Sequence, residues 1–79
     1  MERTQIADAI QAIIAEQISK PQQSIDENAS LESLGMDSLD RVEVVMKIEE
    51  KFNVEMSDER VDAINTVREL IDYVDSLKK

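Results

Sequence analysis

The sequence contains no cysteine and no histidine, and each absence excludes a class of chemistry. Without cysteine the chain has no disulfide, no thiolate metal site and no thiol nucleophile. Without histidine it has no Ser-His-Asp triad. Glycine and proline each occur once, and no apolar run approaches the roughly 20 residues that span a bilayer. The chain therefore lacks the usual groups of nucleophilic catalysis and the usual signal of a membrane helix.

Basic residues are also scarce. The chain has 9 lysines and arginines against 18 aspartates and glutamates, for a net charge of -9. Nucleic acids and anionic membranes are bound by basic surfaces, so we expect neither nucleic-acid binding nor stable membrane insertion. The acidity instead favours partners with basic surfaces. The segment from Met1 to Thr4 lacks the apolar region of a signal peptide, and we expect a cytoplasmic monomer.

The length and the apolar spacing predict the fold class. A chain of 79 residues makes one small domain, expected over residues 1–79, with about 60% of its unfolded surface buried. Apolar periodicity predicts helices over residues 4–18 and 37–52, a short one over 57–64, and a last one from Thr66. Residues 19–36 form a long loop, which is more often functional than idle. The predicted fold is all-α: a small four-helix bundle with three longer helices, a short third helix and a long first loop.

The apolar residues of these segments are the predicted core. In the first helix they are Ile6, Ala7, Ile10, Ile13, Ile14 and Ile18. In the long loop they are Ile25, Leu31 and Leu34. In the last helix they are Val67, Leu70, Ile71, Val74 and Leu77. Thr66 and Glu69 fit a capping box at the start of this last helix.

The helix predicted over residues 37–52 carries two apolar stripes. With about 100° per residue, one stripe shares an arc typical of a core-facing surface and consists of Val44, Val45, Ile48 and Phe52. The other lies nearly opposite and consists of Leu39, Val42 and Met46. The acids that flank it are Asp40, Glu43, Glu49 and Glu50. This second stripe has three interpretations. The bundle covers both sides of the helix, or these are ordinary exposed apolar residues, or the stripe is a docking face for a basic partner.

A serine precedes this helix in the stretch GMDSLD, which begins at Gly35. Asp37 is expected to cap the helix, with Asp40 at its third position, so Ser38 is not needed as a cap. Ser38 is also a poor nucleophile by itself, because neighbouring carboxylates disfavour its ionisation. The nearest lysine, Lys47, lies about two and a half helical turns away. Ser38 can still be a passive acceptor, since Gly35 permits a tight turn and the helix start favours an attached phosphate.

These residues carry a family resemblance over nearly the whole chain. The motif is Gly35-Met36-Asp37-Ser38-Leu39-Asp40, followed by Val42-Glu43-Val44-Val45-Met46 and Glu49-Glu50-Lys51-Phe52. With the length, the acidity and the long first loop, it resembles the acyl carrier protein of type II fatty acid synthesis. The resemblance implies that Ser38 is the attachment point for 4'-phosphopantetheine, added by a phosphopantetheinyl transferase. It also implies that growing acyl chains are carried as thioesters on the thiol of that arm, and that the protein catalyses nothing itself.

The resemblance also implies the partner surface. Fatty acid synthesis enzymes with basic docking patches would contact Asp37, Leu39, Asp40, Val42, Glu43, Met46, Glu49 and Glu50, and the acyl chain would fold back between the helices. A carrier of another pathway, such as polyketide, lipid A-linked or aminoacyl transfer, shares these features. An acidic helical interaction module without covalent cargo is the alternative from a different class.

Three positions depart from the family pattern, and none of them belongs to the Asp-Ser-Leu triplet. Arg41 stands where a small or neutral residue is expected, and this predicts a positive charge beside the acidic face. Leu31 replaces an expected aromatic residue, and Ser33 replaces an expected acid. Two acidic pairs, Glu49 with Glu50 and Asp58 with Glu59, are conceivable weak cation ligands, but a solvated surface is the commoner case, and we assign no metal site.

Overall fold

The structure is a computed structural model that describes residues 2–78. Its elements in chain order are α1 (Arg3–Ile18), the short 3-10 helix η1 (Gln22–Ser24), α2 (Ser38–Phe52), α3 (Asp58–Asp62) and α4 (Val67–Leu77). No strand is formed within residues 2–78, where the only sheet-like pairing is an isolated bridge between Ser30 and Thr66. The predicted all-α fold, with three longer helices, one short helix and a long first loop, is confirmed.

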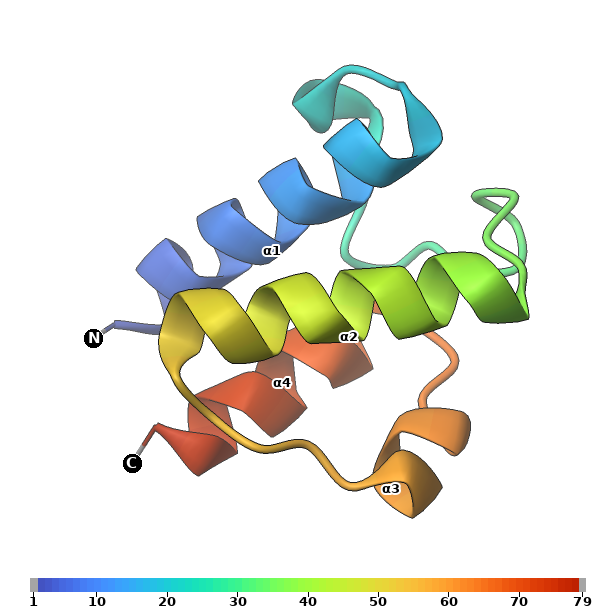
Figure 1. Cartoon of the computed structure of the whole chain (residues 1–79). Coiled ribbons are helices and arrows are strands. Elements are labelled where there is room, and N and C mark those ends of the chain that lie inside the picture. The colour runs from blue at the N-terminus through green and yellow to red at the C-terminus, as the bar shows by residue number, and fades with distance from the viewer. Residues whose placement is uncertain (1, 79) are drawn as a thin grey trace.

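The helices are arranged so that α1 packs against both α2 and α4. Figure 1 shows α2 crossing in front of this pair, with α3 lying below the N-terminal half of α2. Both ends of the chain lie on the side where α2 ends (Figure 1). Among the described helices none has the length and apolarity needed to cross a membrane.

The core is almost entirely aliphatic. Its most deeply buried side chains are Ile6, Ile10, Ile14, Val44, Ile48, Val67, Ile71 and Val74. Removing most of one such side chain, as in Ile→Ala, costs about 2–5 kcal/mol in a well-packed core. The two aromatic residues, Phe52 and Tyr73, are also buried. The predicted apolar face of the first helix, the stripe of α2 that contains Val44 and Ile48, and most of the predicted face of the last helix therefore face the interior.

Two predictions at the ends of helices are wrong. Leu77, expected on the packed face of the last helix, is 36% exposed, because α4 reaches its last turn there and no further element covers it. The predicted capped start of the third helix is confirmed, since Ser57 is its N-cap, but the helix ends at Asp62 rather than at about Ile64. The predicted capping box of α4 is confirmed, since the Glu69 amide donates to Thr66 Oγ1 at 3.1 Å and the Thr66 amide donates to Glu69 Oε1 at 3.1 Å.

The long first loop is anchored to the rest of the fold by buried side chains, a backbone hydrogen bond and an ion pair. Ile25 and Leu31 are buried, so two apolar side chains anchor it to the core. The Leu31 amide also donates to the Asn65 carbonyl at 2.8 Å. Arg3 spans the loop and α4 by contacting Glu27 at 3.0 Å and Asp72 at 2.8 Å. The loop therefore delivers the chain to the start of α2 in a defined position.

Candidate functional site

Ser38 lies at the junction of this loop with α2. Asp37 is the N-cap: its Oδ1 accepts from the Asp40 amide at 2.9 Å, and the Asp37 amide donates to Asp40 Oδ2 at 3.2 Å. This reciprocal capping box satisfies two backbone donors that the helix start leaves free. The predicted cap is thus confirmed, and Ser38 is the first residue of the helix rather than its cap.

Gly35 makes the turn that precedes this junction. Its φ of +84° is a left-handed conformation that side chains disfavour. A Cβ built on Gly35 would meet no atom within 4 Å. The glycine is therefore required by the backbone conformation, while the space around it is open, as an approaching partner would need.

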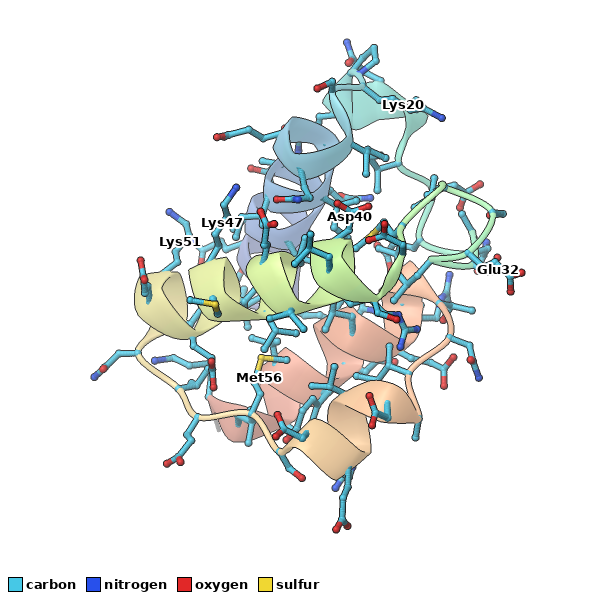
Figure 2. All side chains as sticks on the ribbon, turned by 45° about the vertical axis from the view of Figure 1, so that its right-hand side comes forward. Lys20, Glu32, Asp40, Lys47, Lys51 and Met56 are labelled. Carbon is cyan, nitrogen blue, oxygen red and sulfur yellow. The ribbon has the colours of Figure 1, made fainter. Side chains whose placement is uncertain are left out.

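The hydroxyl of Ser38 is exposed and has no hydrogen bond to any residue of the described chain. Lys47 is not directed at it, because its Nζ donates to Gln17 Oε1 at 3.3 Å on the side of α2 that faces α1. Figure 2 shows Lys47, Lys51 and Asp40 together along that side. Ser38 therefore has the geometry of an accessible acceptor, with no histidine in the chain and with Lys47 directed elsewhere.

The second apolar stripe of α2 faces outward. Leu39 is 65% exposed, Val42 55% and Met46 54%. The interpretation that the bundle covers both sides of this helix is therefore wrong. What remains is an apolar strip that starts next to Ser38 and runs along α2.

The flanking acids divide into two groups. Asp37, Glu43 and Glu50 are exposed. Asp40 and Glu49 are partly buried and have internal partners: Asp40 Oδ1 accepts from Gln17 Nε2 at 3.0 Å, and Glu49 Oε2 accepts from the Met56 amide at 2.9 Å. The first group is the more accessible to a partner's lysine or arginine, although Asp37 accepts from the Asp40 amide and Glu43 accepts from Gln17.

Gln17 was not singled out by the sequence, yet it joins α1 to three residues of α2. Its Nε2 donates to Asp40 and, at 3.2 Å, to Glu43 Oε2, while its Oε1 accepts from Lys47. The pKa of Asp40 lies below its ordinary value, because hydrogen bonds stabilise its ionised carboxylate. The hydrogen bond from Gln17 has the larger effect and that from the Asp37 amide the smaller. No local sequence pattern could reveal a contact between residues 23 positions apart.

We expect Gln17→Ala to raise the pKa of Asp40 back toward its ordinary value of about 3.9. The pKa of Asp40 is lowered in the folded protein, so ionised Asp40 stabilises the fold at pH values above its ordinary pKa. This stabilisation is lost as the pH falls through the lowered pKa of the folded protein. Gln17→Ala should therefore be less stable than the wild type at neutral pH, and it should lose less stability than the wild type on acidification, because most of the Asp40 contribution is already missing. Carboxyl NMR titration measures the pKa directly. Gln11→Ala is the control, since Gln11 also extends from α1 but donates to the Ile25 carbonyl, and an equal shift in both variants would contradict the assignment.

Arg41 lies next to the acidic face, where it lines one groove with Ser38 and Glu49, but its charge is directed inward rather than presented to a partner. Its guanidinium is partly buried and donates to the carbonyls of Val61, at 3.5 Å, and of Ile64. The signal was present in the helical repeat, because Arg41 falls only about 20° from Ile48 on the wheel and thus on the core-facing side. A charge placed there has to find acceptors, and the backbone carbonyls at the end of α3 supply them.

The two acidic pairs do not gain the ligands of a cation site. Across the described residues, no group of three or more His, Cys, Asp or Glu side chains is close enough to hold a metal ion. In the first pair, Glu49 is already used by the Met56 amide. The structure gives no support to a divalent-ion site at either pair.

Comparisons with known proteins agree on one family. The family model described as "phosphopantetheine attachment site" matches residues 8–74. The chain is 41% identical over 80 aligned positions to an acyl carrier protein from Cyanidioschyzon merolae, covering 100% of this chain and 88% of the relative. It is also similar to the crystal structure of an acyl carrier protein from Thermotoga maritima, with a TM-score of 0.83 and 32% identity, covering 98% of this chain and 91% of the other.

Proposed function

Because the chain belongs to the acyl carrier protein family, with its phosphopantetheine attachment domain, we propose that it carries growing fatty acyl chains in type II fatty acid synthesis. The attachment point is Ser38, and residues 1–79 act as a single carrier domain. The protein acts as a cytoplasmic monomer and catalyses nothing itself. A phosphopantetheinyl transferase modifies it, and synthesis enzymes with basic patches receive its cargo.

The exposed, unpartnered hydroxyl of Ser38 is the observation that carries this proposal. Asp37 already caps the helix, so modifying Ser38 removes no stabilising contact. A phosphate attached to Ser38 Oγ would lie at the N-terminus of a 15-residue helix, where the positive end of the dipole favours it. The residues present therefore fit the group. When attached, the arm supplies a thiol for thioester cargo, which a chain without cysteine lacks.

The docking face extends from this serine along α2. Exposed Leu39, Val42 and Met46 provide apolar contact area. Asp37, Glu43 and Glu50 are exposed and can pair with basic side chains of a partner, while the partly buried Asp40 and Glu49 contribute mainly charge. An acidic rim around an apolar strip speeds association with a basic partner and fixes its orientation.

Intact mass after incubation with a phosphopantetheinyl transferase and its donor tests the proposal. We expect a gain of one phosphopantetheine, mapped by peptide fragmentation to Ser38. No gain in the presence of an active transferase would mean that the chain is an acidic interaction module. Identifying the thioester cargo in native extracts separates fatty acid synthesis from polyketide or aminoacyl transfer, and a cargo other than a fatty acyl chain would refute the proposed pathway.

A further inference from the structure

Two hollows beside Ser38 share part of their walls. An open groove includes Ser38 and is bounded by α2 and α3, with Val42, Met46, Asp58 and Asp62 among its lining. A small apolar cavity lies behind it and is lined by Leu31, Met36, Val44, Ile64 and Leu70. Arg41, Val45 and Val61 line both hollows. These three side chains therefore form the boundary between the groove at Ser38 and the apolar interior.

The cavity is closed to cargo in this conformation. Its volume is about 10 Å³, which is no more than the space needed for one water molecule. An alkyl chain cannot enter unless the boundary moves. Five of the lining residues are buried, and the partly buried ones are Arg41 and Val45 of α2 and Val61 of α3. Because α2 packs on α1, the part of this boundary that can yield is Val61 on α3.

The helix α3 packs on the core through Val61, and its Arg60 guanidinium lies 4.8 Å from the centroid of the Tyr73 ring. It spans only Asp58–Asp62 and contains no buried residue. At its start, the Ser57 amide donates to Tyr73 Oη at 2.9 Å. Its C-terminal end is bound to α2 by Arg41, which donates to the Val61 and Ile64 carbonyls. Hydrogen bonds from a charged donor are stronger than those between neutral groups. Of the described residues that line the cavity, Arg41 is the only one with a charged side chain.

We propose that Arg41 is the gate residue of the cargo cavity and determines which acyl chains are held inside. Its guanidinium latches α3 over the cavity, and the latch has to release before a chain attached at Ser38 can enter. The cost of release is the same for every chain, whereas the gain from burial grows with each methylene. Short chains therefore stay outside, and only chains above a threshold length open the gate. The latch itself is independent of the proposed function, while its effect on cargo rests on it.

Amide hydrogen exchange on the unmodified protein tests the latch. The reporting amides are those of Val61, Ala63 and Ile64, which donate to Ser57, Arg60 and Val61 carbonyls respectively. Arg41→Met keeps a long side chain but has no hydrogen-bond donor. We expect it to speed the exchange of these amides roughly tenfold, because a tenfold change corresponds to the loss of about one charged hydrogen bond. Exchange within α1 and α4 should stay unchanged.

Lys51→Met is the matched control, because it removes the same charge from an exposed position of α2. It should leave the three amides unaffected. Arg41→Lys keeps the positive charge but has fewer donors, so it should give an intermediate exchange rate. It also tests the latch if Arg41→Met folds poorly. Wild-type exchange in Arg41→Met, or an equal rise in α1, would overturn the latch.

A series of straight-chain acyl groups loaded on the holo protein tests the specificity. Burial of cargo raises the melting temperature by ligand-like stabilisation, so this rise should begin at a shorter chain length in Arg41→Met than in the wild type. An unchanged threshold would overturn the role of Arg41 in selecting cargo. If instead Ser38 takes no phosphopantetheine, the proposed function fails, and the exchange experiment still decides whether Arg41 is a latch.

Discussion

Ser38→Ala is expected to abolish phosphopantetheine attachment and all thioester loading while leaving the helices intact. The hydroxyl is the atom that would be modified, and the described chain gives it no hydrogen-bond partner to lose. Asp37 supplies the cap of α2, so the loss of unfolding free energy should stay below about 1 kcal/mol, the usual effect of losing a cap. Intact mass measures the attachment, and circular dichroism with thermal unfolding measures the fold.

Ser33→Ala is the control for this change. Ser33 is an exposed serine in the loop before Gly35, and its hydroxyl donates to the Ser30 carbonyl at 2.8 Å. The variant should be modified as fully as the wild type. A mass gain on Ser38→Ala would place the attachment elsewhere, and a loss of helicity in that variant would make Ser38 a structural residue.

Glu43→Lys should weaken binding to the phosphopantetheinyl transferase by roughly 5- to 30-fold. A tenfold loss of affinity corresponds to about 1.4 kcal/mol of binding free energy. Glu43 is exposed beside the Leu39, Val42 and Met46 strip and lies about one and a half helical turns from Ser38. The change removes one ion pair, worth about 0.2–1 kcal/mol when exposed, and adds repulsion against a basic partner. Much of the effect should fall on a salt-sensitive association rate.

Glu43 is a cleaner target than Asp40 or Glu49, because its internal hydrogen bond from Gln17 is at the exposed surface and holds no backbone group. Asp40 takes part in the capping box of α2, and Glu49 holds the Met56 amide, so changing either would disturb the fold as well as the surface. Glu16→Lys on α1 is the matched control, since Glu16 is exposed and the charge change is equal. Surface binding at two salt concentrations separates the cases. Equal losses in both variants would mean that only net charge matters, and salt-independent losses would rule out electrostatic docking.

Local interactions account for what the sequence determined by itself. The core-facing stripe of α2 follows from a repeat of 3.6 residues per turn, and both capping boxes, Asp37 with Asp40 and Thr66 with Glu69, join residues three apart. The position of Ser38 at the start of α2 follows from the same local signals. Such features need only the chain's own neighbours within about one turn, so they are visible in the order of the residues.

Contacts between elements were decided by the tertiary structure. Gln17 reaches Asp40 across 23 positions, and Arg41 reaches the Ile64 carbonyl, also across 23. The helical repeat places Arg41 on the core-facing side, but a backbone carbonyl has no residue-specific signature, so no pattern names its acceptor. The same holds for Glu49 and the Met56 amide. The sequence thus determined which face each side chain occupies, whereas the packing of one helix on another determined which acids stay free for a partner and which cation closes the cavity.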